Sequence, residues 1–190
     1  MNHSPITFQV CRSVDAQGVS DFLYSIRDEL YFAERHVATE MTELLFSHGC
    51  VFTGVVNNEI VAVIGALFGE PAQAYANKAV GFIYVAGLAK PYRGTAAFRI
   101  GFRFVLEHFQ TIGLQEVRFH ALETDARLNA MYSSFARPIG KERNRRGFSC
   151  VLYGRSIEDA LVTLNERQRR RNIYNPTPHA FHHVSNVYHE

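Results

Sequence analysis

The first third of the chain alternates between polar and apolar positions with two different periods. Ile6, Phe8 and Val10 are separated by polar residues, which predicts a half-buried strand. After Asp15 the apolar residues recur at helical spacing, so we expect a long helix that ends at about Phe32. Its expected apolar face comprises Val19, Phe22, Leu23, Ile26 and Leu30. A short second helix follows, with Thr39 as its N-cap and an apolar face made of Met41, Leu44 and Leu45.

The middle of the chain is rich in β-branched residues and predicts three strands. Residues 51–56 and 60–68 are expected to form a hairpin, because Asn57 and Asn58 between them tolerate the left-handed backbone of a tight turn. A loop of small residues separates this hairpin from a third apolar run, residues 79–88, which we predict to be a buried strand.

The second half of the chain continues with alternating helices and strands. An amphipathic helix follows the third strand, and then come a strand over residues 116–122 and a helix over residues 125–135. Two short strands, at residues 138–141 and 147–153, are expected to pair, and a last helix begins at Ile157. This element order predicts a single α/β domain with a β-α-β core.

Length and composition agree with one domain. The chain has 190 residues, of which 47% are hydrophobic and 20% charged, as in ordinary globular proteins. We place the domain in residues 1–160, and we assign residues 161–190 to a basic helix end and an irregular tail rich in His, Pro and Asn. The formal net charge of +2 disfavours nucleic acid as a partner.

Cysteine spacing and hydropathy indicate a cytoplasmic protein. The three cysteines are widely spaced and form no CxxC pair, which favours reduced thiols. No signal-peptide pattern is present and no apolar run approaches the roughly 20 residues that span a bilayer, so we expect no membrane association. We also predict no metal site, because further ligands are missing around the tail histidines, which are His179, His182 and His183.

The junction between residues 79–88 and the next helix carries the strongest candidate chemistry. It contains an arginine, a glycine, three small residues and an aromatic residue, which are Arg93, Gly94, Thr95, Ala96, Ala97 and Phe98. A strand–helix turn of this composition presents consecutive backbone N–H groups and a helix dipole to an anion. We therefore expect a phosphate-binding turn and a phosphorylated ligand.

Two segments resemble motifs of the GNAT superfamily of N-acyltransferases. Pro91-Tyr92-Arg93-Gly94 is similar to the family's P-x-Y-R-G-x-G-x-G/A segment, with one residue fewer between Pro and Tyr. Asp125-Ala126-Arg127-Leu128-Asn129-Ala130-Met131-Tyr132 is similar to its N-x-R-A-x-x-L-Y helix. The resemblance implies an α/β fold with a mixed, mostly antiparallel sheet of roughly six or seven strands, flanked by about four helices and followed by a C-terminal helix and tail.

The resemblance further implies a coenzyme-A-dependent N-acyltransferase that transfers acetyl from acetyl-CoA to a primary amine, on a small molecule or a protein. In this family the turn at residues 93–98 holds the pyrophosphate of coenzyme A, and the pantetheine arm lies along the preceding strand, near Ala86 and Leu88. A backbone N–H near these residues would meet the oxyanion. Tyr132 matches the tyrosine that protonates the departing thiolate.

Two departures from the family pattern leave alternatives open. In the turn, Ala96 stands where the motif has Gly, and Phe98 stands where it has Gly or Ala. In addition, the strand at residues 79–88 has no carboxylate or histidine that could act as the general base. His120 and Glu123 are the candidate bases, with proton relay by water as the alternative.

Other functions and partners are consistent with the same residues. The donor could carry a longer acyl chain, on coenzyme A or an acyl-carrier protein, and the domain could be a non-catalytic GNAT-like binding module. Residues 141–146 are interpreted as a solvated turn before the last strand, with a basic lip for substrate or cofactor as the alternative. The basic run at residues 167–171 complements a helix dipole, and the aromatic tail at residues 174–188 could pack on a second copy in a homodimer.

Overall fold

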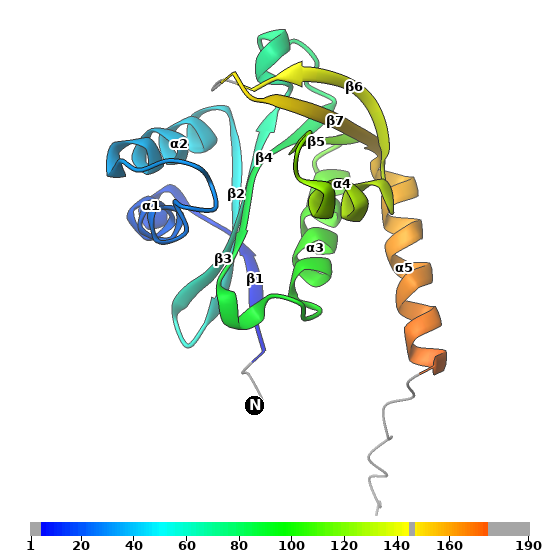
Figure 1. Cartoon of the computed structure of the whole chain (residues 1–190). Coiled ribbons are helices and arrows are strands. Elements are labelled where there is room, and N and C mark those ends of the chain that lie inside the picture. The colour runs from blue at the N-terminus through cyan, green and yellow to red at the C-terminus, as the bar shows by residue number, and fades with distance from the viewer. Residues whose placement is uncertain (1–4, 145–146, 175–190) are drawn as a thin grey trace, which may run out of the picture.

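The computed structural model describes residues 5–144 and 147–174, which form a sheet with helices on both faces (Figure 1). The elements follow the expected order along the chain. They are β1 (Thr7–Val10), α1 (Ala16–Ser25), α2 (Arg35–His48), β2 (Gly49–Val56), β3 (Glu59–Phe68), β4 (Val80–Leu88), α3 (Ala97–Thr111), β5 (Glu116–Leu122), α4 (Ala126–Ser133), β6 (Arg137–Arg143), β7 (Ser149–Ser156) and α5 (Ile157–Tyr174).

The described strands form one seven-stranded sheet in the order β1-β2-β3-β4-β5-β7-β6. Every neighbouring pair is antiparallel except β4 and β5, which run parallel because α3 forms a crossover between them. This mixed, mostly antiparallel sheet is the fold class that the sequence predicts, and it is confirmed.

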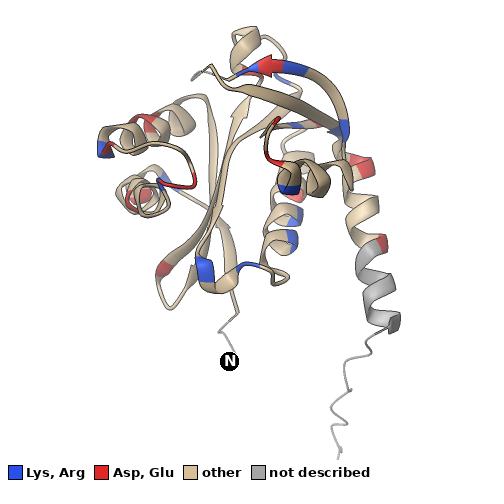
Figure 2. Cartoon of the chain, viewed as in Figure 1, with Lys and Arg blue, Asp and Glu red and all other residues tan. Residues whose placement is uncertain are grey.

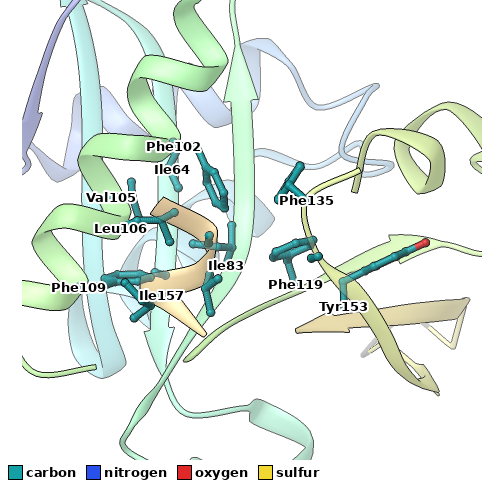
Figure 3. Packing of buried hydrophobic residues seen from close by; sticks show 14 of the residues in the cluster. Ile64, Ile83, Phe102, Val105, Leu106, Phe109, Phe119, Phe135, Tyr153 and Ile157 are labelled. Atoms are coloured by element: carbon teal, nitrogen blue, oxygen red, sulfur yellow. The ribbon is translucent and has the colours of Figure 1, made fainter. Parts of the chain in front are cut away.

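Each face of the sheet has its own hydrophobic core. On one face, α1 and α2 cover β2, β3 and β4, and their core includes Val19, Leu23 and Leu45, all fully buried. On the other face lie α3, α4 and α5, whose core contains Phe109 and Phe119 (Figure 3). Burial of this much apolar surface supplies most of the driving force for folding.

Local sequence signals account for the hairpin and for several boundaries. Asn57 and Asn58 have φ values of 49° and 65°, as the β2–β3 turn requires, so the predicted hairpin is confirmed. The strand predicted over residues 116–122 is β5, and the last helix begins at Ile157 as predicted. Helix α5 continues across residue 160, and the domain boundary there stays a prediction.

The two N-terminal helices differ from the prediction. Helix α1 ends at Ser25 rather than near Phe32, although Ile26 beyond it is still buried. The chain then turns repeatedly, and Tyr31 adopts a φ of 58°. The apolar period continues because these turns still pack on the core, which is why periodicity alone overstates the helix.

Helix α2 is correspondingly longer than predicted. It begins at Arg35, with Glu34 at the N-cap position, and it runs to His48. Thr39, which the sequence suggested as the cap, lies inside the helix, where its hydroxyl contacts that of Ser20 on α1 at 3.3 Å. The threonine therefore joins two helices instead of starting one.

The C-terminal hairpin is also larger than the short pairing predicted. Strand β6 spans Arg137–Arg143 and pairs with β7. The basic run that was interpreted as a turn is therefore strand up to Arg143, while residues 145 and 146 lie outside the described part of the chain. Figure 2 shows basic and acidic residues side by side at the end of β6.

Candidate active site

Strands β4 and β5 separate halfway along the sheet. They pair only between residues 80–83 and 116–119, although β4 continues to Leu88 and β5 to Leu122. A β-bulge lies at the same place, because Ile83 pairs with Ala66 and Val85 with Gly65, which leaves Tyr84 without a partner on β3. A bulge bends the strand that contains it and increases its twist, which gives a physical reason for the separation.

A cleft of about 450 Å³ lies at this separation. Strand β4 contributes the stretch from Phe82 to Ala86, and the cleft is closed by side chains from β5, α4, β6, β7 and the loop after α1. These include His120, Leu122, Leu128, Tyr132, Glu142, Cys150 and Tyr31. The cleft therefore collects ionisable groups from segments that are distant in the sequence.

Tyr132 reaches the cleft from α4, and aromatic rings surround its own ring. Phe119, Tyr153 and Phe135 lie 4.4, 5.7 and 5.9 Å away between ring centroids. Burial raises the pKa of the Tyr132 phenol, and the nearby Asp125 carboxylate raises it further. The hydroxyl is therefore kept protonated, as a proton donor requires.

Helix α4 is fixed to the sheet by hydrogen bonds at its start. The Asp125 carboxylate caps it by accepting from the N–H of Leu128 at 2.8 Å. Asn129 donates to the carbonyl of Leu122, at the end of β5, at 2.8 Å and accepts from the Tyr153 hydroxyl at 2.9 Å. These bonds hold Tyr132 at the edge of the cleft.

His120 lies on β5 and faces Glu142 of β6. Its Nε2 forms an ion-pair contact with the Glu142 carboxylate, and both side chains are mostly buried. The imidazole also stands edge-on to the ring of Phe82, with 4.9 Å between centroids. Sequence reasoning suggested His120 but missed Glu142, which it took for part of a charged turn.

Glu123, the second base suggested by the sequence, is placed differently. Its carboxylate pairs with Lys141, both side chains are exposed, and it does not line the cleft. Cys150 does line the cleft, but it is buried, and burial raises the pKa of its thiol. Neither residue presents a reactive group to the cleft in the way that His120 and Tyr132 do.

The predicted anion-binding turn connects β4 to α3. Gly94 has a φ of 74°, and a Cβ built there would meet nothing within 4 Å, so the turn is open. The Thr95 hydroxyl accepts from the N–H of Ala97 at 3.1 Å, and Ala96 occupies the N-cap position of α3. The helix start thus offers backbone amides and the positive end of the α3 dipole to an anion.

Arg93 stabilises this turn and does not extend into the cleft. Its guanidinium donates to the carbonyl of Leu88 at 2.7 Å and pairs with Glu29, from the loop after α1, at 2.8 Å. Leu88 therefore anchors the turn, whereas Ala86 lines the cleft.

The aromatic residue within the motif is accommodated by the core. Phe98 is half-buried and stacks on Phe102 with 5.8 Å between ring centroids, so its ring packs against the core below α3. Ala97 beside it is buried.

No protein-family model matches this chain, and no curated protein matches its sequence. Solved structures do share its architecture. A structure from Desulfovibrio desulfuricans that is described as an acetyltransferase of the GNAT family superposes with a TM-score of 0.63 at 13% identity, covering 80% of this chain and 99% of that one. The ribosomal-protein-S18-alanine N-acetyltransferase from Escherichia coli superposes with a TM-score of 0.60 at 11% identity, covering 80% of this chain and 94% of that one. The chain has the GNAT fold. A ribosomal-protein-S5-alanine acetyltransferase from Vibrio fischeri has the same architecture. It superposes with a TM-score of 0.61 at 12% identity, covering 84% of this chain and 97% of that one.

Two other expectations concern metal ions and membrane-spanning helices. Among the described residues, no three His, Cys, Asp or Glu side chains are grouped so that they could hold a metal ion. The tail histidines and the aromatic residues beyond 174 lie outside the described residues. Within residues 5–144 and 147–174, no helix combines the length and the hydropathy needed to cross a membrane.

Proposed function

We propose that this protein is an N-acetyltransferase that transfers the acetyl group of acetyl-CoA to a primary amine by direct attack. One observation carries the proposal: the cleft opens where β5 leaves β4, and the protonated hydroxyl of Tyr132 borders it. A thioester placed in this cleft has a proton donor within the same site.

The donor would bind along β4 and the turn that follows. Beyond residue 83, β4 remains paired with β3 but not with β5, so alternate peptide groups of β4 are free to bind an amide-containing arm. The start of α3 would hold the pyrophosphate through the backbone groups of residues 93–98. Because Arg93 is engaged with Glu29 and Leu88, the main-chain amides supply most of this interaction.

The reaction then needs a proton acceptor, an oxyanion site and a proton donor. A protonated amine must lose a proton before its nitrogen can attack, and of the two bases that the sequence suggests, His120 and Glu123, His120 lines the cleft. A backbone N–H near Ala86 would stabilise the oxyanion of the tetrahedral intermediate. Tyr132 would protonate the thiolate as the carbon–sulfur bond breaks. Glu123 is the less suitable base because Lys141 occupies its carboxylate.

The acceptor is an amine carried by a small molecule or by a protein N-terminus. Two structures that share the fold are described as ribosomal-protein-alanine acetyltransferases, and another as an aminoglycoside 6'-acetyltransferase. Peptides that begin with alanine and an aminoglycoside are therefore the first acceptors to test.

The test has a binding arm and a transfer arm. Thermal unfolding is recorded with acetyl-, hexanoyl- and palmitoyl-CoA, and acetyl transfer to the two acceptor types is followed by mass spectrometry. At a concentration about 100 times the dissociation constant, a ligand that binds only the folded state stabilises it by about 2.7 kcal/mol. We expect acetyl-CoA to raise the melting temperature. A shift with palmitoyl-CoA alone would favour the longer-chain donor, and no shift with any donor would refute the enzymatic proposal.

A truncated donor separates the cleft from the turn. S-Acetyl-N-acetylcysteamine contains the thioester and part of the arm but lacks the pyrophosphate. We expect it to stabilise the protein far less than acetyl-CoA at equal concentration. Equal stabilisation by both compounds would show that the turn at residues 93–98 does not bind the donor.

A further inference from the structure

The contact between His120 and Glu142 forms through the order of the strands. In the sheet, β7 lies between β5 and β6, and Leu122, Cys150 and Glu142 are in register across the three strands. His120 is two residues before Leu122 on β5, so its side chain is on the same face of the sheet. The Glu142 side chain crosses over β7 to reach it.

The surroundings of this pair favour a defined arrangement of the imidazole. The exposed fractions of the His120 and Glu142 side chains are only 21% and 23%, and the edge-on ring of Phe82 limits rotation of the imidazole. The Glu142 carboxylate lies against Nε2 as an ion-pair contact. A carboxylate at this position favours the neutral tautomer with its proton on Nε2, which leaves Nδ1 as the unprotonated nitrogen of the ring. Nε2 is one of the buried side-chain atoms without a hydrogen-bond partner among the described residues, so the Glu142 carboxylate is the polar group that lies next to it.

We propose that Glu142 and His120 form a proton-accepting dyad in which Glu142 is the positioning residue and His120 Nδ1 receives the proton of the acceptor amine. The inference rests on the proposed acetyl transfer and extends it to a residue that the sequence motifs do not include. Glu142 fixes the tautomer of His120 and stabilises the imidazolium that forms when the ring takes up a proton.

The step balances without any further reactant. An N–H bond of the substrate ammonium breaks, its proton passes to Nδ1, and the electron pair becomes the lone pair that attacks the thioester carbon. A carbon–nitrogen bond forms, the carbon–sulfur bond breaks, and Tyr132 gives its proton to the thiolate. The attacking nitrogen loses its second proton as the amide forms, and a proton from water restores the Tyr132 hydroxyl. The proton on His120 passes to water.

Two nucleophiles with the same spacing between ring and amine test whether the dyad removes a proton. 2-Phenylethylamine is protonated at neutral pH and needs a base, whereas the terminal nitrogen of benzhydrazide is already neutral. We expect Glu142→Gln to lower kcat about tenfold and His120→Gln about a hundredfold with 2-phenylethylamine. Both variants should retain nearly the wild-type kcat with benzhydrazide and nearly the wild-type melting shift with acetyl-CoA.

The double variant and a matched control complete the kinetic test. Because two residues that act as a unit are not additive, His120→Gln with Glu142→Gln should be no slower than His120→Gln alone. Glu158→Gln, on the exposed start of α5, is the matched control and should leave kcat unchanged. Equal losses with both nucleophiles in Glu142→Gln, or no loss with 2-phenylethylamine, would overturn the dyad.

A spectroscopic measurement tests the same proposal without turnover. Long-range ¹H–¹⁵N spectra of the imidazole rings, with the His120 signals assigned by their loss in His120→Gln, report which nitrogen carries the proton. We expect the Nε2–H tautomer in the wild-type protein and a mixture of tautomers in Glu142→Ala. A proton on Nδ1 in the wild-type protein would overturn the proposal. Failure of the proposed function is a separate result, because it appears as the absence of any melting shift with acetyl-CoA.

Discussion

The two halves of β4 have the same neighbour on one edge and different neighbours on the other. Residues 80–83 are hydrogen-bonded to β3 and β5 and are buried, whereas residues 85–88, beyond the bulge, pair with β3 alone and include the exposed Ala86. The first half therefore belongs to the folding core, and the second half can bind a ligand. One strand serves both purposes because a bulge at Tyr84 divides it.

The largest expected effect is a loss of stability beside residues 80–83, the half of β4 that is closed by pairing with both β3 and β5. Arg118 of β5 lies opposite Phe82 and pairs with Glu70, whose side chain is only 2% exposed, and with Glu116. Replacing Arg118 by Met leaves the Glu70 carboxylate buried without its partner, which costs about 3–5 kcal/mol. Chemical denaturation should show this loss in the free energy of unfolding.

A second substitution checks the reason for that loss. Adding Glu70→Gln to Arg118→Met removes the unpaired charge, so the double variant should be more stable than Arg118→Met alone. If the single variant unfolds at the wild-type denaturant concentration, the ion pair is not part of what stabilises the closed half.

The next largest effect is expected on catalysis, beside the open half of β4, where the strand no longer pairs with β5. Tyr132→Phe removes the proton donor but keeps the aromatic contacts with Phe119 and Phe135. We expect turnover to fall about a hundredfold, equivalent to about 2.7 kcal/mol of transition-state stabilisation, with acetyl-CoA affinity nearly unchanged. Steady-state kinetics and a binding titration measure the two quantities. Undiminished turnover would remove Tyr132 from the mechanism.

A pair of alanine and valine substitutions separates the two halves directly. A Cβ at Gly81, in the closed half, would lie 2.4 Å from Cε2 of Phe109, so Gly81→Ala should destabilise the fold by about 1–3 kcal/mol through overpacking. Ala86→Val, in the open half, should change stability by less than about 0.5 kcal/mol. It should instead weaken acetyl-CoA binding, because the added methyl groups narrow the cleft.

The opposite pattern would contradict the division of β4. Thermal unfolding without ligand and titration with acetyl-CoA, performed on both variants, are sufficient. If Ala86→Val loses stability and keeps its affinity, the second half of the strand is structural as well.

The smallest effect is a dependence of stability on alkaline pH. The pKa of Tyr132 is raised in the folded protein, so above about pH 10 the unfolded chain loses this phenolic proton while the folded chain keeps it. The unfolded state then binds fewer protons, and the free energy of unfolding falls as pH rises. Tyr132→Phe lacks this contribution, so above about pH 10 its free energy of unfolding should fall less steeply with pH than that of the wild type. Denaturant melts over this range measure the difference between the two slopes, and equal slopes would contradict it.

Much of the fold follows from local patterns. The boundaries of β5 and the β2–β3 turn were predictable because a strand's alternation and an Asn-Asn turn depend on residues close in sequence. The ends of α1 and α2 were not, since buried turns around Ile26 keep the helical spacing of apolar residues without forming a helix.

The candidate site divides in the same way. The turn at residues 93–98 and Tyr132 were found from short motifs, each within a single segment. Glu142 was missed because nothing near it in the sequence distinguishes a cleft carboxylate from a solvated one, and the run of charges around it suggests the latter.

The sequence by itself therefore determined the order of the helices and strands along the chain, the α/β class and the two motifs that suggest donor binding. Only the tertiary structure decided which side chains meet. Arg93 pairs with Glu29 across 64 residues and Arg118 with Glu70 across 48, while Glu142 reaches His120 over an intervening strand. Such contacts depend on strand order and register, which are set by how the whole sheet packs and not by the residues beside each partner.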